Sequence, residues 1–123
     1  MSLTNTFKAL GDRNRLRMVH ALFQREELCA CQLIELLEVS GATASRHMSI
    51  LFQAGIVESR KDGRWVHYRL SQETVELNSM FKWLEVEIKN DFSFREDIKK
   101  LSQITSCEPD ELRKKQREQA CCT

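Results

Sequence analysis

The apolar positions of this chain recur at helical spacing through most of its length, which predicts six helical stretches. We expect them over about residues 4–10, 13–23, 28–39, 42–54, 71–90 and 94–101. Gly11 ends the first stretch, and Asp12 is placed to cap the second. Ser40 and Gly41 break the chain between the third and the fourth, so these two helices should be joined by a tight turn.

The fourth predicted helix has two unlike faces when its residues are placed about 100° apart around the axis. The face expected to be buried carries Ala44, Met48, Leu51 and Phe52. The opposite face carries Ala42, Thr43, Arg46 and Ser49. Small side chains, hydroxyls and one guanidinium on the outward face would allow this helix to enter a groove.

A hairpin is predicted directly after this helix. Residues 56–60 and 65–70 read as strands, and they flank Lys61-Asp62-Gly63-Arg64, where the Asp-Gly pair is a strong turn signal. Together with Arg60, this connection gives the hairpin a basic tip. Its charges would mainly neutralise phosphates, which supplies affinity and salt dependence and not sequence choice.

The order of a short helix, a tight turn, an outward-polar helix and a basic hairpin indicates a winged helix-turn-helix, a mainly α fold with a small β-hairpin (α+β). The fourth helix would then enter the major groove of double-stranded DNA. The predicted DNA contacts are Ser40, Ala42, Thr43, Ser45, Arg46, His47, Arg60, Lys61 and Arg64. Arg46 can donate two hydrogen bonds to a guanine edge, whereas His47 suits a buried or capping role as well as a phosphate contact.

Charge and hydropathy add modest support for a DNA-binding protein. The net charge is only +1, but residues 1–70 carry ten Lys and Arg against seven Asp and Glu, while residues 71–123 carry nine against eleven. No apolar run approaches the roughly 18 residues of a membrane span. The polar residues 4–6 stand where a signal peptide would need its apolar stretch, so we expect a cytoplasmic protein without membrane contact.

The five cysteines are the candidate chemistry of the chain: Cys29, Cys31, Cys107, Cys121 and Cys122. Their odd number and two closely spaced pairs argue against a secreted disulfide framework, so they should be thiols open to metals, metalloids or oxidants. The spacing from Cys107 to Arg113 is that of phosphatases and of one class of arsenate reductases. The loop between them holds three acidic residues and Pro109, which would repel an oxyanion, so we expect no enzyme.

Several segments resemble, in register with one another, the ArsR/SmtB family of homodimeric bacterial repressors that release DNA on binding a metal or metalloid. They are Leu10–Asp12, Arg15–Arg17, Glu27–Leu33, Ser45–Met48, Ala54–Val57 and Gly63–Leu70. The resemblance covers about residues 4–90 and departs from the family at Gly41-Ala42, where relatives usually carry polar side chains.

This resemblance implies a homodimer on a near-palindromic operator, formed through the first and last core helices. The surplus of apolar residues over 71–90, among them Trp83 and Val86, fits such an interface. We therefore expect a DNA-binding and dimerisation domain over 1–90. Residues 91–123 should add a C-terminal helix and a mobile cysteine-containing tail, in which Leu112 has no face to pack against.

Within the resemblance, Cys29 and Cys31 stand where arsenic-responsive members place their sensor thiolates. The implied function is a repressor of an arsenic and antimony resistance operon, released when trivalent As or Sb binds these soft ligands. Residues i and i+2 of a helix point about 200° apart. One bound atom should therefore distort the start of helix 28–39 and displace the reading helix.

The third sulfur ligand is left open, because Ile34 stands where the best-known arsenic sensors carry another Cys. Cys107 is the first candidate, Cys121 and Cys122 are others, and a two-thiol site would suit a monosubstituted organoarsenical. An alternative is a repressor of the same fold that responds to Zn, Cd, Pb or thiol oxidation. A thiol-based metal buffer without DNA binding is another, and no obligatory cofactor is expected.

Overall fold

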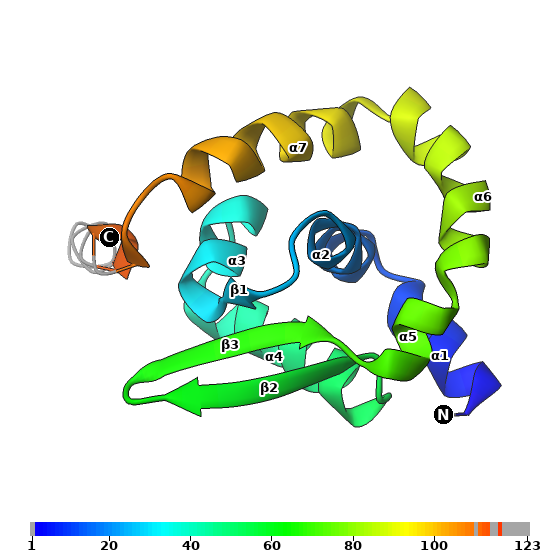
Figure 1. Ribbon diagram of the computed structural model, residues 1–123, viewed down its shortest axis with the longest axis horizontal. Coiled ribbons are helices and arrows are strands. Elements are labelled where there is room, and N and C mark those ends of the chain that lie inside the picture. The colour runs from blue at the N-terminus through cyan, green and yellow to red at the C-terminus, as the bar shows by residue number, and fades with distance from the viewer. Residues whose placement is uncertain (1, 110, 114–115, 117–123) are drawn as a thin grey trace.

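The computed structural model describes residues 2–109, 111–113 and 116 of the chain (Figure 1). Its elements are α1 (Leu3–Leu10), α2 (Arg13–Gln24), β1 (Leu28–Cys29), α3 (Ala30–Leu37), α4 (Gly41–Gln53), β2 (Val57–Asp62), β3 (Trp65–Leu70), α5 (Gln72–Glu76), α6 (Asn78–Asn90) and α7 (Phe92–Thr105). Helix α2 lies in the centre, with α6 and α7 arching over it on one side and the sheet on the other (Figure 1). None of the described helices is long and apolar enough to cross a membrane.

Helices α3 and α4 form the predicted pair joined by a tight turn. Glu38 takes a left-handed conformation at the end of α3, with φ 56°. Ser40 then caps α4, its hydroxyl oxygen accepting a hydrogen bond from the Thr43 N–H at 3.1 Å. Followed by the β2–β3 hairpin, this arrangement is the predicted winged helix-turn-helix.

The buried face of α4 is confirmed except at its end. Ala44, Met48 and Leu51 are at most 3% exposed, but Phe52 is 49% exposed, so the prediction that it is buried was wrong. Ala44, Met48 and Leu51 follow one another at i, i+4 and i+7 and turn one stripe toward the core. Phe52 follows Leu51 by about 100° around the axis and lies outside that stripe.

The second strand of the hairpin lies where predicted, over residues 65–70, but the first strand is longer and the turn is shorter than predicted. The pairing of β2 with β3 continues to Asp62 and Trp65, which leaves only Gly63 and Arg64 in the turn. Gly63 has φ 61°, a conformation that glycine adopts without a steric penalty and that two-residue hairpin turns require. The two strands are therefore paired up to the turn, and the wing is a continuous two-stranded ribbon.

The predicted third helix begins two residues later than expected, because Leu28 and Cys29 form a strand. This strand β1 pairs antiparallel with β3, with Leu28 opposite Tyr68 and Cys29 opposite His67, and the sheet order is β1-β3-β2. Helix α3 starts only at Ala30. The prediction of a helix from residue 28 was wrong because the backbone of these two residues pairs with β3, about forty positions further along the chain.

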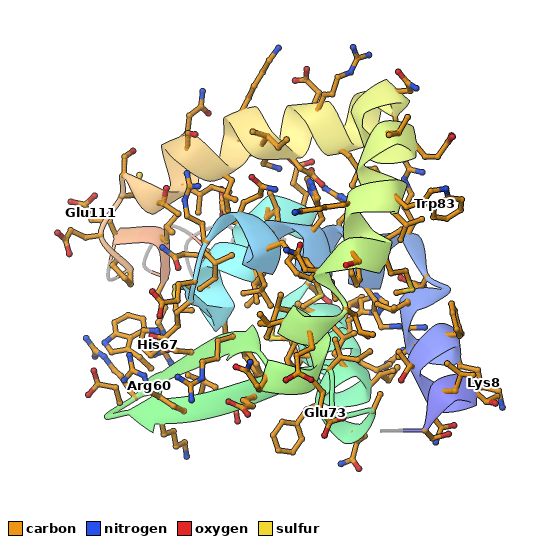
Figure 2. All side chains as sticks on the ribbon, turned by 45° about the vertical axis from the view of Figure 1, so that its right-hand side comes forward. Lys8, Arg60, His67, Glu73, Trp83 and Glu111 are labelled. Atoms are coloured by element: carbon orange, nitrogen blue, oxygen red, sulfur yellow. A yellow bond between two sulfur atoms is a disulfide. The ribbon has the colours of Figure 1, made fainter. Side chains whose placement is uncertain are left out.

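The predicted helix over 71–90 is broken at Leu77 into α5 and α6. Two hydroxyls anchor α5 against the start of β2: Ser71 donates to the Gly55 carbonyl at 2.7 Å, and Thr74 donates to the Ile56 carbonyl at 3.0 Å. Both side chains are buried, so these bonds fix the direction of α5. On α6, Trp83 points away from the rest of the molecule and is 70% exposed (Figure 2).

The described part of the C-terminal segment packs against the domain, contrary to the expectation for Leu112. Residues 109, 111–113 and 116 are helical, and Leu112 is 4% exposed within the main hydrophobic core. The segment lies beside α3 (Figure 1). The expected boundary at residue 90 falls where α6 gives way to α7.

A buried ion pair joins α7 to α2. The Arg17 guanidinium donates to both carboxylate oxygens of Asp97 at 2.8 Å and to the Leu36 carbonyl at 3.1 Å. The side chains of Arg17 and Asp97 are 16% and 7% exposed. The hydrogen bonds to Asp97 raise the pKa of Arg17 above its usual value, so the guanidinium stays charged.

Replacing Asp97 by Ala should lower the free energy of unfolding by about 3–5 kcal/mol, because the Arg17 charge stays buried without its counterion. Urea unfolding followed by circular dichroism would measure this. The control is Glu96→Ala on the same helix, whose exposed pair with Lys99 should be worth about 0–1 kcal/mol. Equal effects of the two substitutions would show that the Arg17–Asp97 pair has no special part in stability.

Candidate functional site

The outward face of α4 displays the predicted groove-reading side chains. Ala42, Ser45 and Arg46 are exposed, and Thr43 is half-buried next to the Ser40 cap. The Ser40 hydroxyl donates to the Thr43 hydroxyl at 2.9 Å, in addition to accepting from its N–H. Their hydroxyls are therefore partly used in capping, and Arg46 is the longest exposed donor on this face.

His47 lies against the start of α2 and is half-buried. Its Nδ1 is 3.1 Å from Nη1 of Arg15 and 3.9 Å from Oδ1 of Asp12. Burial raises the pKa of the Asp12 carboxyl, but the Arg15 N–H and the charges of Arg15 and His47 outweigh it, so the pKa falls below its usual range. Of the two roles left open for His47, this contact favours the structural one, which ties α4 to α2.

The basic tip of the wing is less free than its sequence suggests. Arg60 donates to both carboxylate oxygens of Glu27, at 2.6 and 3.1 Å, whereas Lys61 and Arg64 are exposed. These bonds lower the pKa of the Glu27 carboxyl below its usual range. Glu27 also lies 3.6 Å from Nδ1 of His67, and Figure 2 shows Arg60 and His67 on the same part of the hairpin.

Cys29 and Cys31 face each other across the junction of β1 and α3, where a disulfide joins them. Cys29 has the extended conformation of a residue that precedes a helix, with φ −79° and ψ 159°, and Cys31 lies in the first turn. Their Cα atoms are 5.5 Å apart. The expectation that two such sulfurs meet only if the helix distorts was wrong, because Cys29 is not helical.

The surroundings of the pair are nearly closed to solvent. Cys29 is 2% exposed and Cys31 is 6% exposed. Cys31 Sγ lies 4.0 Å from the Pro109 carbonyl oxygen, and the Gln116 side-chain amide donates to the Cys31 carbonyl at 2.8 Å. The described C-terminal residues thus cover the thiol site from one side.

The structure does not bring Cys107 to this pair. Cys107 is free and exposed. Over the part of the chain that the structure describes, no three His, Cys, Asp or Glu side chains gather into a group able to hold a metal ion. Cys121 and Cys122 lie outside the described residues.

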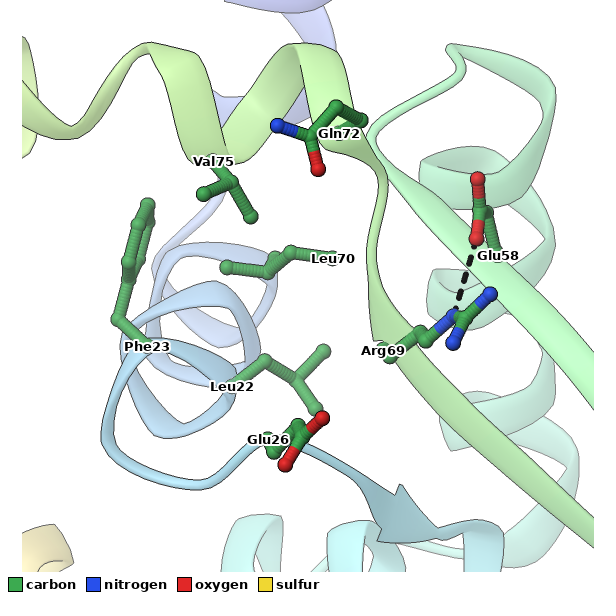
Figure 3. A pocket seen from close by; sticks show the side chains of 8 residues that line it. All are labelled: Leu22, Phe23, Glu26, Glu58, Arg69, Leu70, Gln72 and Val75. Atoms are coloured by element: carbon green, nitrogen blue, oxygen red, sulfur yellow. Dashed lines mark hydrogen bonds and ion pairs between the residues drawn. The ribbon is translucent and has the colours of Figure 1, made fainter.

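A cavity of about 450 Å³ lies away from the thiols, between α2 and the junction of β3 with α5 (Figure 3). It is lined by Leu22, Phe23, Glu26, Glu58, Arg69, Leu70, Gln72 and Val75. Arg69 donates to Glu58 at 3.0 Å within this lining. None of the lining residues is a cysteine, so we do not assign this cavity to the thiol site.

Sequence reasoning missed Glu27 and Gln116 at these sites. Glu27 borders the Cys-x-Cys motif, but its link to Arg60 becomes visible only once β1 is paired with β3. Gln116 stands 85 positions from Cys31, in a segment without a periodic apolar pattern. No local signal would have found either contact.

Comparisons with known proteins agree on one family. Residues 12–59 match the model of the family described as bacterial regulatory protein, arsR family. The cadmium resistance transcriptional regulatory protein CadC of Listeria innocua is 45% identical over 67 residues, which are 54% of this chain and 56% of that protein. The arsenical resistance operon repressor of Escherichia coli K12 is 46% identical over 65 residues, 53% of this chain and 56% of that repressor. The chain thus spans just over half the length of these curated relatives.

Solved structures extend the likeness over more of the fold. Reduced HlyU from Vibrio cholerae is 31% identical with a TM-score of 0.58, and the match covers 66% of this chain and 82% of that one. A homodimeric winged helix-turn-helix DNA-binding domain from Mycobacterium bovis, a possible ArsR-family regulator, is 26% identical with a TM-score of 0.62. That match covers 69% of this chain and 79% of the domain.

Mild oxidation of the reduced protein should close a disulfide between Cys29 and Cys31, because their side chains already face each other. Trypsin cuts after Arg25 and Arg46, so both cysteines lie in one peptide, and Cys107 lies in another. Mass spectrometry should find that the first peptide has lost two hydrogen atoms. A cross-link between these two peptides would contradict the geometry described here.

Proposed function

Because the chain belongs to the ArsR family of bacterial regulatory proteins, we propose that it is a DNA-binding transcriptional repressor controlled by thiol chemistry at Cys29 and Cys31. The observation that carries the proposal is the pair of facing sulfurs in the element that leads into the helix-turn-helix. The relatives named above are regulators, and the proposal includes no catalytic role.

The DNA surface in this proposal is the outward face of α4 together with the wing. The proposed contacts are Ser40, Ala42, Thr43, Ser45, Arg46, Arg60, Lys61 and Arg64. His47, which the sequence also offered, is assigned the structural role because it lies against Arg15 and Asp12 of the neighbouring helix start. Arg46 reads a base edge, and Lys61 and Arg64 meet phosphates. Arg60 reaches DNA only by leaving Glu27, so we give it a smaller share in affinity.

A homodimer on a near-palindromic operator is part of the proposal. Leu3 and Phe7 of α1 are 74% and 55% exposed, and Trp83 and Val86 of α6 are 70% and 62% exposed. Large apolar side chains at this exposure are typical of a surface that a partner covers. The homodimeric domain from Mycobacterium bovis supports the same assembly.

The proposed inducer is trivalent arsenic or antimony, bound by the reduced thiols of Cys29 and Cys31. Soft thiolates select such acceptors, and the relative from Escherichia coli is an arsenical resistance operon repressor. Cys107, Cys121 and Cys122 are the candidates for a third sulfur, and Cys107 would have to leave its present place to serve. Cadmium or zinc is the alternative metal, in view of the CadC relative.

Thiol oxidation is a second candidate signal, and the disulfide between Cys29 and Cys31 favours it. Either signal would act through β1. Cys29 is paired in register with His67, and His67 is paired with Arg60. A change in the position of Cys29 would therefore reach the wing at the adjacent strand β3, and Arg60 at the strand beyond it. The ligand weakens DNA binding only to the extent that it prefers the altered arrangement.

Arg46→Ala should weaken binding to DNA from upstream of the gene by about 1–3 kcal/mol, because a bidentate contact to a base is lost. Lys61→Ala should weaken binding to all sequences and reduce the salt slope by about one. Fluorescence anisotropy measures both. Gln53→Ala, an exposed change at the far end of α4, is the control and should leave affinity unchanged. If Arg46→Ala leaves the affinity for DNA unchanged, α4 does not read a base through Arg46.

Replacing both Cys29 and Cys31 by Ser should preserve DNA binding but abolish release by arsenite and antimonite, since the soft ligands are gone. The control is Cys107→Ser, which keeps release unless Cys107 supplies the third sulfur. If Cd²⁺, Zn²⁺ or an oxidant releases the wild-type protein from DNA and arsenite and antimonite do not, the inducer is that metal or oxidation and not arsenic or antimony. Release of the double variant by arsenite would place the sensor elsewhere.

A further inference from the structure

One helical segment follows α7 and reaches back to the thiol pair. Its described residues are 109, 111–113 and 116, and we call them the C-terminal strap. Leu112 anchors the strap in the hydrophobic core, where its side chain is 4% exposed. The strap lies beside α3, on the same side of the molecule as the tip of the wing (Figure 1).

Two residues of the strap contact Cys31. The Gln116 side-chain amide donates to the Cys31 carbonyl at 2.8 Å and to the Glu35 carboxylate at 3.3 Å. These two acceptors are four positions apart, so Gln116 spans one turn of α3. At its other end the strap places the Pro109 carbonyl oxygen 4.0 Å from Cys31 Sγ. The strap therefore touches both the backbone and the sulfur of this cysteine.

A third contact joins the strap to the wing. The guanidinium carbon of Arg113 lies 5.4 Å from the centre of the Trp65 ring, and that of Arg64 lies 5.2 Å from it, both within the range of a cation–π contact. A cavity of about 260 Å³ lies where the strap, the wing tip and α3 meet, and it is lined by Ala30, Cys31, Ile34, Arg64, Trp65, Val66, Arg113 and Gln116. The cavity borders Cys31, and two residues of the strap form part of its wall.

The described cysteines differ in their access to solvent. Cys29 and Cys31 are 2% and 6% exposed, whereas Cys107, just before the strap, is exposed. A thiol reacts only with a molecule that reaches its sulfur. The strap is held by few contacts, and Leu112 is the one buried side chain among its described residues. A segment held in this way opens at a smaller cost in free energy than the whole domain.

We propose that the C-terminal strap is a lid over the thiol pair, and that Cys29 and Cys31 react in the fraction of molecules in which the strap has left α3. Their rate of reaction is then the product of that fraction and the rate of the uncovered thiols. The inference rests on the proposed function in taking the pair as the sensor. It adds that the strap sets how fast the sensor responds, whichever acceptor the thiols meet.

The test measures how fast iodoacetamide alkylates each cysteine of the full-length protein, reduced, freed of reductant and without DNA. The thiolate displaces iodide and forms an S–C bond, and the thiol proton goes to the buffer. Trypsin then gives one peptide over 26–46, with Cys29 and Cys31, and another over 101–113, with Cys107. Mass spectrometry follows both peptides, so Cys107 is an internal reference in every sample.

Leu112→Ala removes the anchor of the strap and should speed alkylation of Cys29 and Cys31 at least about tenfold, because the open fraction rises. Alkylation of Cys107 should change less than about twofold, because this thiol is already exposed. The matched control is Leu101→Ala on α7, which removes a buried leucine from the same core but outside the strap. It should speed alkylation of the pair less than about threefold.

A second variant leaves the core untouched. Gln116→Ala removes two hydrogen bonds to α3 and should speed alkylation of the pair about threefold. This variant keeps the test decisive if Leu112→Ala does not fold. Its matched control is Gln103→Ala, an exposed change on α7, which should leave the rate unchanged.

The lid is refuted if both strap variants are alkylated at the wild-type rate, or if Leu101→Ala speeds alkylation as much as Leu112→Ala does. Release from DNA by arsenite or an oxidant is measured separately, by fluorescence anisotropy. If the strap variants are alkylated faster but no thiol reagent releases the wild-type protein from DNA, the strap covers the thiols and the proposed sensor is wrong. If release occurs and the alkylation rates do not differ, the sensor stands without a lid.

Discussion

The pairing of two residues, Leu28 and Cys29, with β3 is the constraint on which the thiol site depends. It draws Cys29 out of the helix that follows and into an extended conformation, so its side chain can turn toward Cys31. In a continuous helix the two sulfurs would point to different sides. The same pairing makes β3 the middle strand of the sheet and places Cys29 next to the wing in register.

Hydrogen bonds from two other helices hold the C-terminal end of α3 in place. Its C-terminal carbonyl at Leu36 accepts hydrogen bonds from Arg17 of α2 and Lys100 of α7, and Arg17 is held in turn by Asp97. These contacts resist rotation of α3 as a rigid body. In the proposed regulation, a change at the thiol pair would therefore act through β1 and the Glu27–Arg60 contact, toward the wing.

The parts of the fold that follow local periodicity could be predicted from the sequence, and those that depend on distant partners could not. The stripe from Ala44 to Leu51 and the Asp62-Gly63 turn signal gave α4 and the hairpin with small errors at their ends. Strand β1 has only two residues, which are too few to show a pattern. Leu112 is an isolated apolar residue in the sequence, and it is buried by packing against the hydrophobic core. For the site, the motif pointed to Cys29 and Cys31, but their surroundings depend on β3 and on Gln116.

Oxidation and the proposed inducer would compete for the same two sulfurs, so the two candidate signals are linked. A disulfide between Cys29 and Cys31 leaves neither sulfur able to displace a hydroxide from arsenic, and a bound arsenical blocks the disulfide. If both states displace β1 in the same way, oxidant and arsenical release DNA alike. If the disulfide keeps β1 where the reduced thiols hold it, oxidation instead protects the repressor from its inducer. The position of β1 in each state, and not the reactivity of the thiols, then decides which signal the wing transmits.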